Sequence, residues 1–184
     1  MKEAREHPGE VVLLYEDECT IYRQPSQAWL WSWMGRRQPR MKYANRNNTR
    51  MRIVGFLDAV TGAVFAQDLS EVSAHRLAQQ VAQLSLRYPH AKTIYLAWDN
   101  WPNHDSGAVR KVLARFPRVK LLWLPTYAPW LNAIEKVWRY LRQRLIHVHP
   151  WCDSFLVLRD SVRAELEVLV EGSYRMLKYV GLST

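Results

Sequence analysis

The stretch Leu124-Pro125-Thr126-Tyr127-Ala128-Pro129-Trp130-Leu131-Asn132-Ala133-Ile134-Glu135-Lys136-Val137-Trp138-Arg139-Tyr140-Leu141-Arg142 changes character at Asn132. Two prolines stiffen the approach, and the apolar residues after Asn132 recur at helical spacing. The apolar stripe consists of Ile134, Val137, Trp138, Leu141 and Leu145. An amphipathic helix is therefore predicted to begin at Asn132, with Glu135 in its first turn beside the buried stripe. A carboxylate held in this way can ligate a metal ion.

Glu135 has two interpretations on this segment alone. Asn132 and Glu135 have the spacing of a capping box, and Glu135 with Arg139 forms an i, i+4 pair of opposite charge, so a purely structural role is sufficient. The functional interpretation depends on whether other acids reach the same place in the fold.

The composition bounds the class of protein. The 184 residues are 48% hydrophobic, which suits one domain with a substantial core. Cys19 and Cys152 lack metal-ligand spacing, so a reduced, intracellular protein is expected. No apolar run is long enough to cross a membrane. The net charge of +9 favours a polyanionic partner, so we expect a cytoplasmic, nucleoid-associated protein that binds DNA or RNA backbone.

Acidic residues follow the first predicted strand. Val11–Tyr15 is apolar on both faces, as in a central strand, and Glu16-Asp17-Glu18 comes directly after it. Because side chains alternate along a strand, Asp17 is expected on one face and its two glutamate neighbours on the other. Only one of these two sets can join a given site.

Regular elements are predicted along the rest of the chain from hydrophobic periodicity and turn residues. Strands are expected at 28–34, 52–60, 63–67, 93–98 and 119–124, and helices at 73–87, 106–116, from 132, and at 153–179 with a break at Gly172. Segments 52–60 and 63–67 read as an antiparallel hairpin, with Asp58 as a turn residue. This order predicts a single α/β domain over residues 1–184, in which a mixed sheet has antiparallel first strands, then parallel strands, and helices on both faces.

A basic segment lies between the second and third predicted strands. It carries Arg36, Arg37, Arg40, Lys42, Arg46, Arg50 and Arg52 without an acid among them. A solvated loop explains this pattern, but aromatic residues interleave with the charges as in surfaces that grip phosphates and stack bases. The tryptophans that are candidates for stacking are Trp29, Trp31, Trp33 and Trp130.

Three acids distant in sequence are predicted to reach one edge of the sheet. Asp17 follows one strand, Asp99 follows another, and Glu135 begins the helix after a third. Sites in open α/β sheets form at the carboxyl ends of parallel strands. Clustered carboxylates need a proton or a cation, and an all-oxygen ligand set favours Mg²⁺ or Mn²⁺. Two such ions are a common device for phosphodiester chemistry.

The three acidic blocks together resemble a known family. Tyr15-Glu16-Asp17-Glu18, Trp98-Asp99-Asn100 with His104, and the stretch from Leu124 to Trp138 are similar to the blocks of the DDE transposases of the IS630/Tc1/mariner superfamily. The resemblance covers about residues 10 to 146. It implies an RNase H-like fold, DNA cleavage at transposon ends and strand transfer into target DNA by a homodimer or higher oligomer.

The resemblance also implies roles for individual residues. Asp17, Asp99 and Glu135 become the catalytic, metal-binding triad for two Mg²⁺ ions, for which Mn²⁺ can substitute. Glu18 is expected to be structural or to support a ligand, Asn100 to shape its turn, and His104 either to act near the scissile phosphate or to be satisfied by a neighbour.

One departure from the family pattern is the short segment before the first strand. Members usually carry N-terminal helix-turn-helix modules that read transposon ends, and no such helix pair fits here, so we expect this region to be absent from the chain. The alternatives to a catalytic domain are a non-catalytic DNA-binding or multimerisation fragment, and an RNase H-like nuclease unconnected with transposition.

Overall fold

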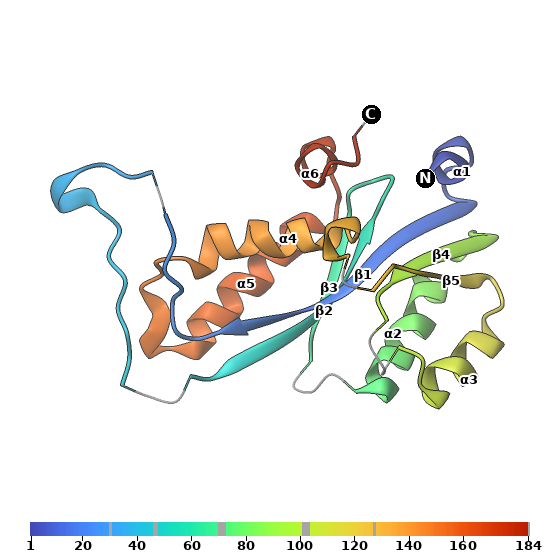
Figure 1. Cartoon of the computed structure of the whole chain (residues 1–184), viewed down its shortest axis with the longest axis horizontal. Helices are drawn as coiled ribbons and strands as arrows, with labels where there is room; N and C mark the ends of the chain where they lie inside the picture. The colour runs from blue at the N-terminus through green and yellow to red at the C-terminus, as the bar shows by residue number, and fades with distance from the viewer. Residues whose placement is uncertain (30, 46–47, 70–72, 101–103, 127, 184) are drawn as a thin grey trace.

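The computed structural model describes every residue except 30, 46–47, 70–72, 101–103, 127 and 184 (Figure 1). Within this part of the chain, one mixed sheet has the strand order β3-β2-β1-β4-β5. The strands are β1 Val11–Tyr22, β2 Arg50–Asp58, β3 Val64–Leu69, β4 Thr93–Trp98 and β5 Val119–Trp123. The first three pair antiparallel, and β4 and β5 continue parallel to β1. The predicted RNase H-like order of antiparallel and then parallel strands is confirmed.

Helices cover both faces of the sheet, as predicted (Figure 1). The helices are α1 Lys2–Glu6, α2 Ala74–Arg87, α3 Gly107–Arg115, α4 Ile134–Leu141, α5 Phe155–Leu169 and α6 Tyr174–Val180. One core joins α4, α5 and α6 to β1, β2 and β3, and a second core joins α2 and α3 to the other face. We call these the α4 face and the α3 face. None of the described helices is long and apolar enough to span a membrane.

Local sequence explains most of these elements. Ser73 and Ser106 cap α2 and α3, because each hydroxyl accepts a hydrogen bond from the backbone N–H three residues on. Asp58 is the predicted turn residue and accepts from the backbone N–H groups of Val60 and Thr61 at 2.8 and 3.0 Å. The C-terminal helical region breaks between α5 and α6, where Gly172 has φ 71°. The short α1 lies in an N-terminal segment for which no helix was predicted.

The predicted end of the first strand is wrong. The strand runs through the acids to Tyr22, because β2 pairs with it continuously from Leu14 opposite Asp58 to Tyr22 opposite Arg50. Backbone pairing to a neighbouring strand outweighs the cost of placing carboxylates mid-strand. Asp17 therefore lies in the centre of the sheet rather than at the end of its own strand.

The strand predicted at 28–34 is also wrong. The described residues there form no strand and make no pairing with the sheet. They belong to an arm, the described residues 24–29, 31–45 and 48–49, which projects from the sheet on the left of Figure 1. Alternating tryptophans stabilise a strand where a second layer of the protein covers one of its faces. Among the described residues, none of the core clusters includes this segment. Trp29 and Trp31 are accordingly fully exposed, at 103% and 107%.

Candidate active site

Asp17 lies on β1 just beyond the point where its parallel neighbour, β4, ends. Ala97 of β4 pairs with Tyr15 of β1, and β4 ends one residue later at Trp98. Two residues beyond that pair, Asp17 and Asp99 reach the same level of adjoining chain segments. On its other side Asp17 remains paired, opposite Gly55 of β2. The aspartate is thus held on a rigid strand beside the open end of β4.

A tryptophan of α4 orients the Asp17 carboxylate. The indole Nε1 of Trp138 donates a hydrogen bond to Asp17 Oδ2 at 3.1 Å. A Cβ atom on Gly55 would lie 2.4 Å from Cη2 of the same indole, closer than any packed atom tolerates. The missing side chain at Gly55 therefore lets the indole lie against β2 and reach the aspartate.

The electrostatics of Asp17 link it to the other two predicted acids. Burial raises its pKa to about 7, and the negative charges of Glu135, Glu18 and Asp99 act in the same direction. A carboxyl group held in this way strongly favours a nearby cation. The other two predicted acids are thus among the charges that raise the pKa of Asp17.

Glu135 lies in the first turn of α4 and borders a cleft of about 420 Å³. The other residues lining the cleft are Pro129, Trp130, Asn132, Lys136, Arg139, Arg142 and His147. Three of them are Lys or Arg, so a basic wall adjoins the acidic group. The arrangement can attract a polyanion toward the carboxylates.

The predicted capping box does not form. The first helical residue is Ile134, its N-cap is Ala133, and no side chain caps the helix. Asn132 instead donates its side-chain Nδ2 to the backbone carbonyl of Glu16 at 2.8 Å. The spacing of Asn132 and Glu135 indicates a cap, but local spacing carries no information about a contact with β1, which is far away in sequence. Its actual contact fixes the start of α4 against β1.

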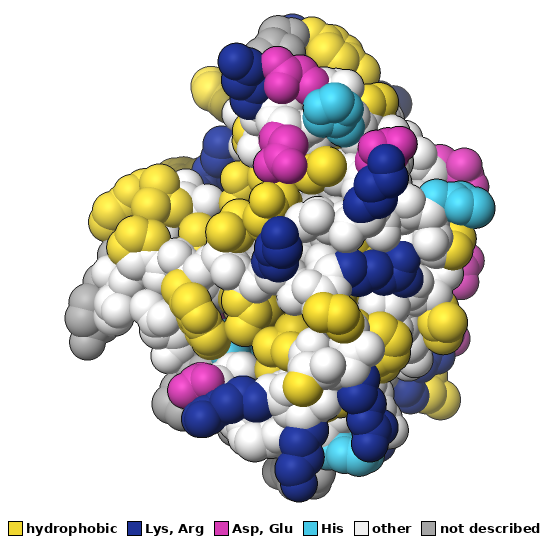
Figure 2. Space-filling view, turned by 90° about the vertical axis from the view of Figure 1, so that its right-hand side faces the viewer, with side chains coloured by type: hydrophobic (Ala, Val, Ile, Leu, Met, Phe, Trp, Pro, Cys, Tyr) yellow, Lys and Arg dark blue, Asp and Glu magenta, His cyan; other side chains and the backbone are white. Residues whose placement is uncertain are grey.

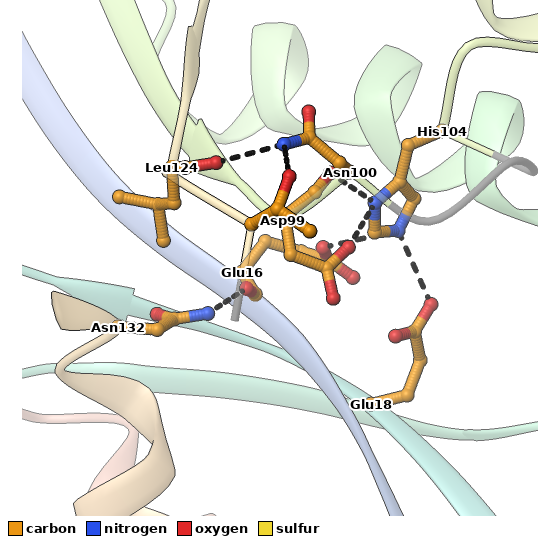
Figure 3. Close-up of polar contacts among 8 residues, drawn as sticks. Glu16, Glu18, Asp99, Asn100, His104, Leu124 and Asn132 are labelled. Carbon is orange, nitrogen blue, oxygen red and sulfur yellow. Dashed lines mark hydrogen bonds and ion pairs between the residues drawn. The ribbon is translucent and has the colours of Figure 1, made fainter. Parts of the chain in front are cut away.

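The opposite face of β1 carries Glu16 and Glu18, which lie around His104, and the same histidine also contacts Asp99 (Figure 3). Glu16 is 1% exposed, and burial raises its pKa well above the ordinary value, with Glu18, Asp17 and Asp99 adding to the shift. The Nε2 atom of His104 lies 3.5 Å from Glu16 Oε2 and 3.3 Å from Glu18 Oε1. Burial lowers the pKa of this histidine, but hydrogen bonds to Asp99 and Glu18 outweigh it and raise the pKa to about 9.

Among the described residues, the acids and histidines whose ligand atoms lie together are Glu16, Glu18 and His104, and not the predicted triad. Asp17, Asp99 and Glu135, the predicted triad, offer carboxylate oxygens alone. Glu16, Glu18 and His104 offer two carboxylates and an imidazole whose ligand atoms lie within 4.8 Å of one another. The predicted triad has the all-oxygen chemistry that suits Mg²⁺, whereas an imidazole favours transition metals.

The predicted basic residues occupy the arm and the start of β2. Arg36, Arg37 and Arg40 are exposed. Lys42 is exposed too but pairs with Asp153 at the start of the C-terminal helices. Arg50 and Arg52 lie in β2, and Arg46 falls outside the described residues. The predicted stacking residue Trp130 is 75% exposed beside the Glu135 cleft.

Sequence reasoning missed two participants in the site. Glu16 is as buried as any core residue, and Trp138, assigned to the apolar stripe, also bonds to Asp17. One signal for the second was present. Gly55 interrupts an otherwise apolar strand, and a glycine inside a strand often marks a close approach by another group.

Comparisons with known proteins agree with this geometry. The family model described as "DDE superfamily endonuclease" matches residues 12–154. A curated relative, "Insertion element IS630 uncharacterized 39 kDa protein" of Shigella sonnei, is 29% identical over 164 residues, which are 89% of this chain and 46% of the relative. The chain thus spans about half the length of that relative.

Solved structures with the same fold include several of Mos1 transposase. A paired-end complex with the left transposon end has a TM-score of 0.66 at 19% identity, covering 98% of this chain and 53% of that one. The catalytic domain of Mos1 mariner transposase has a TM-score of 0.59 at 16% identity, covering 98% of this chain and 80% of that one. The RNase H-like fold and the resemblance to the IS630/Tc1/mariner superfamily are confirmed, and the chain belongs to the DDE superfamily of endonucleases.

Proposed function

We propose that residues 1–184 form a single catalytic domain of a DNA transposase, which cuts insertion-element DNA and joins the freed end to target DNA. The observation that carries this proposal is the register of β1 with β4, which brings Asp17 to the level of Asp99 just beyond the end of β4. Glu135, in the first turn of α4, adds its negative charge to the burial that raises the pKa of Asp17. Membership of the DDE endonuclease superfamily gives this group a chemistry.

Asp17, Asp99 and Glu135 would hold two divalent ions. These would be Mg²⁺, for which Mn²⁺ can substitute. The fit rests on the donor set, since all three groups supply the hard oxygen ligands that these ions prefer. Such ions activate a water or hydroxyl and stabilise the leaving oxygen of a phosphodiester. The Trp138 N–H occupies one acceptor position of Asp17, and a carboxylate has further acceptor positions that can serve for ligation.

DNA is the proposed partner, held by positive charge. The chain carries a net +9, the arm presents Arg36, Arg37 and Arg40, and the cleft beside Glu135 adds further basic side chains. Lys and Arg side chains are also spread over the face in Figure 2, interleaved with hydrophobic, polar and acidic ones. A dispersed charge of this kind suits phosphate contacts from several sides. The active form would be a homodimer or higher oligomer, acting on DNA in the cytoplasm.

The test is cleavage of supercoiled plasmid carrying the insertion-element ends, with Mg²⁺, with Mn²⁺ and with EDTA. The chain should nick in either metal and not in EDTA, and joined products should follow. Asp17→Asn, Asp99→Asn and Glu135→Gln should each abolish nicking while DNA retention stays intact. Asp105→Asn is the matched control, because this exposed carboxylate lies near Asp99 in sequence but pairs with Arg110.

The outcomes separate the rival functions. Retention of DNA without nicking in any metal would favour a non-catalytic binding or multimerisation fragment. Nicks without joined products would favour a nuclease unconnected with transposition. Full activity in any one triad variant would remove that residue from the mechanism.

A further inference from the structure

His104 is the residue of the Asp99 block that the proposed chemistry leaves without a role. Its side chain is 1% exposed, and its ring lies against the Trp98 indole with centroids 4.2 Å apart. Contact with a buried tryptophan restricts the orientation of the imidazole. One ring nitrogen faces Asp99, just beyond the end of β4, and the other faces glutamates of β1.

The Nδ1 atom faces Asp99. It lies 2.8 Å from the carboxylate Oδ1 and 3.1 Å from the backbone carbonyl oxygen of the same residue (Figure 3). Both of these atoms are acceptors, so Nδ1 must carry a proton and donate to them. The imidazole thereby holds both the backbone and the carboxylate of Asp99.

The Nε2 atom faces β1. Glu18 Oε1 lies 3.3 Å away and Glu16 Oε2 lies 3.5 Å away, both on the α3 face of the strand. This strand is paired with β2 through the level of both glutamates and with β4 up to Tyr15. Its glutamates therefore offer a more rigid anchor than a loop would provide.

Asp99 needs such an anchor more than the other two acids do. Asp17 lies within a paired strand and Glu135 within a helix, but Asp99 follows the last residue of β4 and its side chain is 50% exposed. The next residue is tied down separately, since Asn100 Nδ2 donates to the carbonyl of Leu124 and to the Thr126 hydroxyl, each at 3.0 Å. The chain just beyond β4 is thus held by side chains rather than by strand pairing.

We infer that His104 is a positioning residue that anchors Asp99 to Glu18 on β1, and so fixes the Asp99 carboxylate at the level of Asp17. The inference rests on the proposed function, because it treats Asp99 as a cation ligand. It also gives Glu18 a role, as the fixed end of this connection. Groups that orient a metal ligand from behind typically contribute about 10–100-fold to metal affinity or activity.

The experiment separates the two ends of the imidazole. Asparagine at position 104 places an amide N–H near the Nδ1 position and keeps the donor to Asp99, whereas glutamine places one near Nε2 and keeps the donor to Glu18. Mn²⁺ affinity is measured on the purified chain by calorimetric titration. His104→Ala and His104→Gln should weaken it about 10–100-fold, and His104→Asn by a smaller factor.

Two controls exclude a merely structural effect. His149 is another buried histidine, at 3% exposure, whose Nδ1 accepts from the Trp151 backbone N–H. His149→Asn and His149→Gln should leave Mn²⁺ affinity unchanged, whatever they do to the melting temperature. Glu18→Gln should weaken Mn²⁺ binding in the wild-type background but have little further effect in His104→Ala, because the connection is already broken.

Two results would overturn the inference. Mn²⁺ affinity of His104→Ala within twofold of wild type would show that Asp99 is placed without the imidazole. A stoichiometric Zn²⁺ ion in the purified chain, lost in His104→Ala but kept in Asp17→Asn, would make the histidine a metal ligand. If the wild-type chain binds Mn²⁺ in a His104-dependent way but never nicks DNA, the proposed function fails and the positioning role stands.

Discussion

The carboxylates on the two faces of β1 have different contacts. On the α4 face, Asp17 accepts a hydrogen bond from Trp138, and burial raises its pKa, with the charges of Glu135, Glu18 and Asp99 adding to the shift. On the α3 face, Glu16 and Glu18 converge on His104, whose single positive charge can offset one of the two. The acid on the α4 face thus contacts an indole, whereas the acids on the α3 face contact a basic group. The difference teaches that side-chain alternation can place adjacent acids of a single strand in two different chemical environments.

The largest effect should come from removing the indole on the α4 face. Trp138→Ala should lower the free energy of unfolding by about 3–5 kcal/mol, because the side chain is fully buried and leaves a cavity. Urea denaturation measures this loss. Trp130→Ala, at a 75% exposed tryptophan, should change it little, and equal losses in the two variants would contradict the packing described for the α4 face.

A pH titration should separate Asp17 from the other buried carboxyls. Its pKa is raised from 3.8 to about 7, so the folded chain binds more protons than the unfolded chain between these values, and stability falls as pH rises through the window. Asp17→Asn should remove this part of the slope, raising the metal-free melting temperature near pH 7 by about 5–10 °C relative to wild type.

Added Mg²⁺ sharpens the same comparison. It should raise the melting temperature of the wild-type chain more at pH 8 than at pH 5, because ligation needs the deprotonated carboxylates. Asp17→Asn should lose most of this gain. A wild-type profile that matches the variant at every pH would show that Asp17 does not titrate in this window.

A smaller loss is expected when Gly55 gains a side chain. Gly55→Ala should cost about 1–3 kcal/mol, because the new Cβ meets the Trp138 ring. In a Trp138→Phe background the cost should shrink, since phenylalanine lacks the atom that clashes. Urea denaturation of the four proteins gives the coupling energy. Additive losses would mean that the glycine serves strand geometry rather than the indole.

The arm should contribute least to stability, since it lies outside both cores. Arg36, Arg37 and Arg40 changed together to alanine should leave the melting temperature within about 1–2 °C, because exposed substitutions cost little. Binding to plasmid DNA should weaken and show a shallower salt dependence. The matched variant changes Arg76, Lys111 and Arg115, which are exposed on α2 and α3. Equal weakening in both would assign binding to overall charge instead of the arm.

Much of the fold is readable from local pattern. The hairpin of β2 and β3, the capped helices α2 and α3, and strands β4 and β5 all follow from periodicity and turn residues within short windows. The errors arose where pairing between segments distant in sequence decides the secondary structure. Strand β1 continues past its acids because β2 pairs with it. Trp29 and Trp31 lie in no strand, because in the described structure no segment pairs with them.

The site divides in the same way. Asp99 and Glu135 stand out because the end of β4 and the start of α4 can be predicted from the sequence, and all three acids stand out because the family blocks contain them. Their supporting contacts do not, since Trp138 and Asp17 lie 121 positions apart, as do Ser26 and His147 at the base of the arm. Contacts of that kind depend on how two layers settle against each other.

The ties at the base of the arm have a consequence for how this fold can vary. Gln24 forms hydrogen bonds with Ala44 and Asn48, and Ser26 forms one with the segment after α4. These hydrogen bonds join the two ends of the arm and form a neck at its base. Residues can be inserted or deleted beyond that neck without shifting the alignment of β1 with β2. The entropic cost of lengthening such a loop grows only logarithmically. The arm can therefore change in length while β1 and β2 keep their alignment.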